Sequence, residues 1–130
     1  MTDDFTVFWR NDEHASALFY DLMARAEKEA YDDDFLAQLA AYRKAVPTSE
    51  KSDIFAAQYL MHHGDMETAI LCGERAYAKR PIHHAVWSLL SRAYKAVGRY
   101  TDALVLEGYL FKLFEVPIAI DTYPTEAITQ

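Results

Sequence analysis

Apolar side chains recur every three or four positions through nearly the whole chain, which is the spacing that one face of an α-helix requires. Six helices are predicted, over about residues 13–29, 33–45, 51–63, 66–79, 83–97 and 100–114. Gly64 and Gly98 follow two of these helices, and Pro47, Pro81 and Pro117 prevent three others from continuing. Because the connections are only a few residues long, consecutive helices are expected to form antiparallel hairpins.

The predicted hairpins repeat every 34 residues. This spacing of 34 residues separates Gly64 from Gly98, Ala69 from Ala103 and Pro47 from Pro81, and twice this spacing separates Phe19 from Trp87. A small residue where two helices cross lets their backbones approach, and a glycine supplies the left-handed conformation after a helix. Since a single hairpin cannot bury its apolar face alone, the repeat predicts hairpins that stack on one another.

The copy of the repeat between residues 87 and 103 has the most distinctive pattern. Its characteristic residues are Trp87, Leu90, Ser91, Tyr94, Gly98, Tyr100 and Ala103. In type and spacing these residues resemble the tetratricopeptide repeat. The resemblance implies an all-α fold, in which antiparallel helical hairpins stack into a right-handed superhelix with a concave surface.

The two earlier copies match the same pattern less closely, and the resemblance covers about residues 14–114 in total. The second copy keeps the family's residues at Ala57, Gly64, Ala69, Ala76 and Pro81. In that copy Asp53 stands where an aromatic residue is usual, and Gly73 replaces a bulky one. In the first copy Phe19, Leu22 and Pro47 fit, whereas Phe35 and Ala30 replace the small residue and the glycine.

The last predicted helix is apolar on nearly every side, so a second surface is expected to cover it. Candidates are the tail, a following domain or a second copy of the chain. We expect self-association, through Leu106, Leu110, Phe111 and Phe114. Residues 1–114 then form one tetratricopeptide-like domain, and residues 115–130, which contain Pro117 and Pro124, form an extended tail or linker.

Composition excludes several classes of function. The 130 residues suit one domain, and the net charge of −7 argues against sequence-independent nucleic-acid binding. No apolar run reaches the roughly 18 residues of a membrane span. The single cysteine, Cys72, excludes an internal disulfide, and no signal peptide is visible after Met1, so a cytoplasmic protein is expected.

Candidate chemistry is sparse. The pairs His62-His63 and His83-His84 are conceivable zinc ligands, but adjacent helical residues point about 100° apart and no cysteine or carboxylate joins them at ligand spacing. Cys72 has no neighbouring base, and no glycine-rich phosphate loop is present. We therefore expect no metal, no cofactor and no enzymatic activity in this chain.

The resemblance implies that the first helix of each hairpin lines a concave groove. The residues expected to bind a partner there are Tyr20, Phe55, Gln58, Met61, His62, Ser88, Leu89, Arg92 and Lys95. Arg92, Lys95 and Arg99 share one helix face and predict a basic ridge, which favours an acidic or carboxylate-bearing segment.

Two functions from different classes remain open. The first is a non-catalytic scaffold that binds a protein segment in its groove and forms a homodimer through its last helix. The alternative is an N-terminal accessory module of a larger enzyme, such as a transferase, whose catalytic domain lies beyond this chain. RNA-binding helical-pair repeats fit less well, because they favour a period of about 35 residues and a basic groove.

Overall fold

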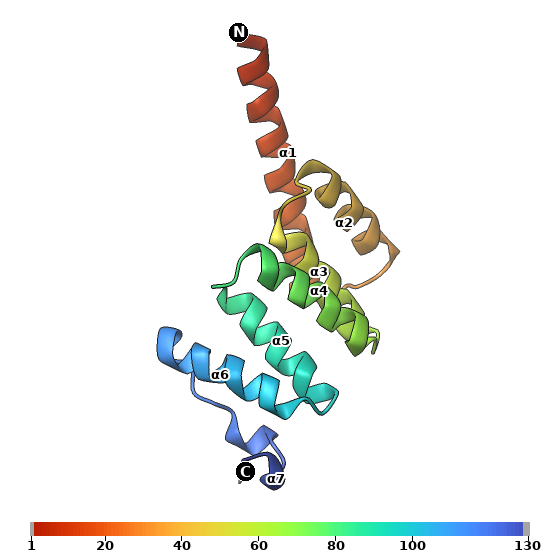
Figure 1. The fold of residues 1–130 in the computed structure, drawn as a ribbon. Helices are drawn as coiled ribbons and strands as arrows, with labels where there is room; N and C mark the ends of the chain where they lie inside the picture. Colours follow the sequence, from red (N-terminus) through yellow and green to blue (C-terminus); the bar gives the residue numbers. More distant parts are fainter. Residues whose placement is uncertain (1, 129–130) are drawn as a thin grey trace.

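The computed structural model describes residues 2–128, and the side chains of residues 13–127. The described residues form helices and no strands, so the all-α prediction is confirmed. The elements are α1 (Thr2–Glu27), α2 (Asp33–Ala45), α3 (Glu50–His62), α4 (Met66–Lys79), α5 (His84–Ala96), α6 (Tyr100–Phe114), η1 (Ile120–Thr122) and α7 (Thr125–Ile128). The first six helices pack in adjacent pairs, α1 with α2, α3 with α4 and α5 with α6, as Figure 1 shows.

Five of the six predicted helices have the expected bounds to within one residue at each end, and α1 is the exception. It begins at Thr2, whereas the apolar spacing predicted a start near residue 13. Residues 2–12 contain neither glycine nor proline, so nothing in the sequence interrupts the helix there. The apolar pattern detected only the part of α1 that packs on other helices, and the rest projects away from the hairpins (Figure 1).

Local signals set the ends of the helices. Asp32 caps α2, because its side chain accepts a hydrogen bond from the Phe35 N–H at 3.0 Å. Gly64 and Gly98 adopt left-handed conformations with φ of 84° and 82°, as their positions after helices predicted. In the first hairpin, Glu29 rather than the expected position 30 adopts this conformation, with φ of 53°.

The core consists of two clusters of buried side chains. The first lies between α1, α2 and α3 and contains Leu18, Leu22, Phe35, Leu39, Tyr42 and Phe55. The second extends from α3 to α6 and is centred on the predicted stripe of Trp87, Leu90 and Tyr94. Ala69 and Ala103, which the period placed at helix crossings, are fully buried in this second cluster.

The burial of Ala103 leads to a stability prediction. Replacing it by leucine inserts three carbon atoms between α5 and α6, so Ala103→Leu should lower the free energy of unfolding by about 2 kcal/mol. Urea denaturation of the variant and the parent measures this difference. Ala96→Leu, on the exposed side of α5, serves as the control and should change stability by less than about 0.5 kcal/mol. An unchanged Ala103→Leu variant would contradict the helix crossing.

Asp53 is a buried charge in the hydrophobic stripe of the second repeat. The residue is 1 % exposed, at the position where the resemblance called for an aromatic residue. Lys79 Nζ lies 2.8 Å from Asp53 Oδ2, and guanidinium nitrogens of Arg43 and Arg75 lie 3.8 and 3.7 Å from Oδ1. The cations therefore come from α2 and α4, on either side of the carboxylate, and compensate its loss of water.

Gly73 explains the second departure from the repeat pattern. A Cβ atom at this position would lie 2.6 Å from Leu90 Cδ2 and 3.2 Å from Leu89 Cδ2. Both leucines are buried, so neither can move freely. The absence of a side chain at Gly73 allows α4 and α5 to pack closely.

The tail is more ordered than the predicted extended linker. Residues 115–119 form neither helix nor strand, and the chain then forms η1 and the short α7. Tyr123 is buried against Tyr100, and Lys95 Nζ lies 5.0 Å from the centre of the Tyr123 ring. Lys95 also pairs with Glu107 at 2.7 Å and donates a hydrogen bond to Thr122 at 2.9 Å, so the tail is fixed to the end of the last hairpin.

Stability should fall at high pH because of buried tyrosines. Burial, together with a 2.9 Å hydrogen bond to Glu74, raises the pKa of Tyr94 to about 12. In the unfolded chain this group ionises near pH 10, so between about pH 10 and 12 only the unfolded state loses the proton and stability decreases. We expect Tyr94→Phe to flatten the fall in melting temperature over this interval. A variant whose melting temperature falls as steeply as the parent's would contradict this origin.

Candidate binding groove

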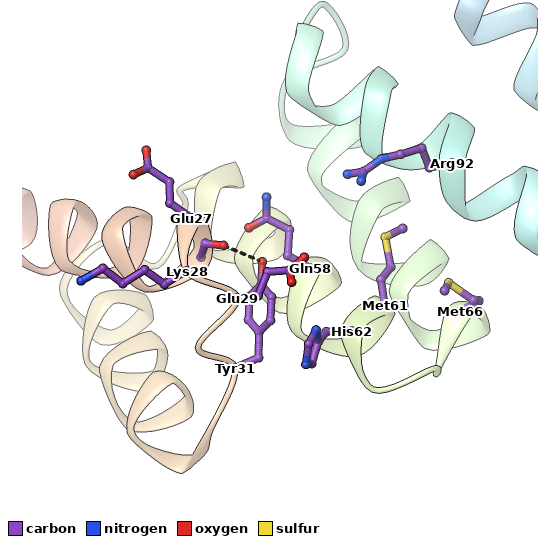
Figure 2. Close-up of a pocket in the computed structure, with 10 residues that line it drawn as sticks. Glu27, Lys28, Glu29, Tyr31, Gln58, Met61, His62, Met66 and Arg92 are labelled. Carbon is purple, nitrogen blue, oxygen red and sulfur yellow. Dashed lines mark hydrogen bonds between the residues drawn. The ribbon is translucent and has the colours of Figure 1, made fainter. Parts of the chain in front are cut away.

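A cavity of about 530 Å³ lies where α1 ends and α3 and α5 face it. Gln58, Met61 and His62 of α3 project into it from one helix face, and Arg92 comes from α5 (Figure 2). The remaining lining residues are Ala26, Glu27, Lys28, Glu29, Tyr31 and Met66. The cavity therefore draws on the first helix of all three hairpins, which is where the resemblance placed a groove.

Tyr31 forms one wall of the cavity. Its ring lies 5.0 Å from the His62 ring, and its hydroxyl group donates a long hydrogen bond of 3.5 Å to the Ala26 carbonyl oxygen (Figure 2). Burial raises the pKa of Tyr31, and the neighbouring Glu29 acts in the same direction. His63 Nε2 lies 2.9 Å from the Tyr31 carbonyl oxygen, so this wall is connected to the end of α3.

The charges around the cavity are divided between its two sides. Glu27, Lys28 and Glu29 lie at the α1 end, and the Arg92 side chain extends from α5 toward Gln58 of α3 (Figure 2). Within the described part of the chain, no carboxylate lies within ion-pair distance of Arg92. Arg92 thus keeps its guanidinium donors available to a bound group.

Gln58 lies between these two sides and carries an unused acceptor. Its side-chain oxygen is buried and has no hydrogen-bond partner among the described residues. A buried carbonyl without a partner costs about 1–3 kcal/mol. A backbone N–H of a bound segment is the kind of group that would remove this cost.

The structure brings together four of the nine residues predicted to bind a partner, namely Gln58, Met61, His62 and Arg92. Two others are corrected, because Phe55 and Leu89 are only 5 % and 2 % exposed and belong to the two core clusters. Tyr20 is exposed but lines a different cavity, beside Phe19 and Lys51, and Ser88 does not line the groove. Helical spacing predicts which residues lie on the inner side of a helix, but it does not distinguish residues that line the groove from residues buried in the core beneath it.

The predicted basic ridge on α5 is wrong in two of its three members. Lys95 is paired with Glu107 beneath the tail, and Arg99 pairs with Asp102 at 2.8 Å while its guanidinium covers the Tyr94 ring. Only Arg92 faces the cavity. The spacing of basic residues along one helix does not show which acidic residues of neighbouring segments pair with them.

Residues of the first connection were missed as binding candidates. Glu29 and Tyr31 lie in the turn between α1 and α2, and Met66 begins α4. Glu29 and Tyr31 enter the cavity because Glu29 adopts a left-handed conformation, which turns the chain after α1. The helical spacing of apolar residues carries no information about such turn positions.

The histidine pairs have structural neighbours. His63 packs on the Tyr59 ring, with ring centres 4.4 Å apart, and His84 packs on Phe114 at 5.1 Å. Among the described residues, no group of three histidine, cysteine, aspartate or glutamate side chains is placed to hold a metal ion. Burial raises the pKa of Cys72, which disfavours its thiolate at neutral pH.

The predicted self-association surface needs correction. Leu106 and Leu110 are buried in the core of the same chain, so they cannot meet a second copy. Phe111 and Phe114 are exposed, as is Leu113 between them. A contact between copies through α6 would therefore use the C-terminal end of the helix rather than the whole helix.

Self-association through this end stays a prediction with a direct test. Phe111 is 56 % exposed, so Phe111→Glu should convert a dimer into a monomer in light scattering without unfolding the chain. Leu71→Glu, at a comparably exposed position on α4, is the matched control and should leave the mass unchanged. A parent that is monomeric at high concentration would contradict the prediction.

No protein-family model matches this sequence, and no curated protein matches it. None of the described helices is both long and apolar enough to cross a membrane. The class that the fold itself defines is an all-α, repeat-like array of adjacent helical hairpins.

Proposed function

We propose that this chain is a non-catalytic, tetratricopeptide-type scaffold that binds an extended protein segment in the groove between α1, α3 and α5. The observation that carries the proposal is the 530 Å³ cavity, to which the inner helix of every hairpin contributes side chains. Stacked hairpins commonly use such concave surfaces for binding.

The groove offers the contacts that an extended segment requires. Met61 and Met66 supply flexible apolar surface, which adapts to different side chains. Gln58 supplies an amide for the backbone of the segment, and Arg92 supplies an unpaired guanidinium for a carboxylate. The segment that fits best is therefore one with an apolar residue close to an acidic one.

Selection from a displayed library of random dodecapeptides on the immobilised chain tests this function. Enriched peptides should carry an acidic residue and should bind more weakly, by about tenfold, to Met61→Glu and to Arg92→Gln. Ile82→Ser, in the exposed connection between α4 and α5, is the control and should bind them as the parent does. Fluorescence anisotropy gives the affinities. A selection that enriches no peptide, or peptides that bind every variant equally, would refute the proposal.

A further inference from the structure

A group of three cations lies outside the groove, where α2 ends, α3 begins and α4 ends. Arg43 from α2 and Arg75 from α4 approach the same oxygen of Asp53, at 3.8 and 3.7 Å, and Lys79 pairs with the other oxygen at 2.8 Å. Since Asp53 is almost fully buried, its carboxylate lies beneath the cations. Three positive charges thus meet around one negative charge.

The three cations are not equivalent. Lys79 lies at ion-pair contact distance, whereas both guanidinium groups lie beyond hydrogen-bond distance from Asp53. Within the described chain, neither Arg43 nor Arg75 has another carboxylate within 4.0 Å, and both side chains are about half-exposed. After Lys79 and Asp53 neutralise each other, two arginine charges remain at the surface with their donors unused.

The surrounding segments increase this positive charge. Residues 43–53 and 75–83 together contain six lysines and arginines and two acids, Glu50 and Asp53, a formal charge of +4. Glu50 already faces Arg80 at 3.4 Å and His83 at 3.6 Å, so it does not neutralise the two arginines. This local charge contrasts with the net charge of −7 of the whole chain and attracts an anionic group to this end of the hairpins.

We propose that Arg43 and Arg75 form a binding site for a carboxylate side chain of an acidic protein segment. Guanidinium groups present a planar fork of donors that matches a carboxylate, and two of them that converge on one oxygen of Asp53 can share a second carboxylate on their outer side. Leu71, one turn before Arg75 on α4, is exposed and provides apolar contact beside the charge. None of these residues lines the groove, so this site is independent of the function proposed above.

Binding of a fluorescein-labelled hexaglutamate peptide, followed by anisotropy at low ionic strength, tests the site. Removing both charges in an Arg43→Gln/Arg75→Gln variant should weaken binding at least about tenfold. Asp53 and Lys79 remain paired in this variant, and a thermal melt verifies that it is folded. The charge-matched control is Arg99→Gln/Lys112→Gln, which removes two positive charges outside both the groove and the Asp53 cluster and should bind within about twofold of the parent.

Each other result has a defined meaning. Equal losses in the two double variants would show a response to net charge alone and would overturn the site. A loss confined to the control pair would move the acidic contact to α6 and also overturn the site. Displacement of the peptide by inorganic phosphate at the same concentration would show a site for free anions and would overturn its assignment to a protein segment.

Discussion

Trp87→Ala should destabilise the chain more than any other single change considered, by about 3–5 kcal/mol. Trp87 lies in the larger core cluster, and its ring packs 5.6 Å from Tyr109 and 5.9 Å from Phe114, both on α6. Its indole N–H also donates a 2.9 Å hydrogen bond to the Pro81 carbonyl oxygen, before α5 begins. The substitution therefore leaves a cavity between α5 and α6 and frees the turn that positions them. Urea denaturation measures the loss.

Trp87→Phe separates the two contributions. Phenylalanine keeps most of the apolar surface but cannot donate to Pro81, so it should cost about 1–2 kcal/mol. A Trp87→Ala variant that loses less than this would show that α6 does not depend on α5 for its position.

The sequence predicted the hairpins well because local signals determine them. Asp32 caps α2, and Gly64 and Gly98 end their helices through conformations that few other residues adopt. The spacing of 34 residues also placed Ala69 and Ala103 correctly in the core. These features depend on neighbours in the sequence or on a strict period, and both can be counted along the chain.

The candidate site was predicted only in part, because its composition depends on contacts between distant segments. Lys95 looked free on its helix face, but Glu107 and Thr122 lie 12 and 27 residues further on and occupy it. The last helix has apolar residues on nearly every side, so Leu106 and Leu110 were predicted to be exposed, but both are buried in the second core cluster. Pairing of charges and depth of burial are tertiary properties that a single-sequence pattern does not contain.

Asp53 is a second feature that depends on tertiary contacts. It stands where the repeat usually has an aromatic residue, and the pattern did not indicate which cations pair with it. The fold accommodates the buried carboxylate because Lys79 of α4 pairs with it and because Arg43 and Arg75 lie within 4.0 Å of it. A buried ion pair of this kind contributes little compared with an apolar pair, but removing one member leaves a charge without compensation. The pair is therefore a sensitive point of the fold.

Lys79→Met should lower the free energy of unfolding by about 3 kcal/mol. Methionine keeps the apolar length of the lysine but removes the cation nearest to Asp53, at 2.8 Å. Arg43 and Arg75 still lie 3.8 and 3.7 Å from Asp53 and compensate part of its charge, and the Lys79 side chain is itself 30 % exposed, so the loss should fall at the lower end of the range for a buried pair. The same urea denaturation gives the value at neutral pH.

A double-mutant cycle decides whether the charge causes this loss. Asp53→Asn removes the negative charge while keeping the shape of the side chain, so in that background Lys79→Met should cost less than about 1 kcal/mol. If Lys79→Met costs the same with Asp53 or with its asparagine variant, packing rather than charge holds α4 against α3 at this point.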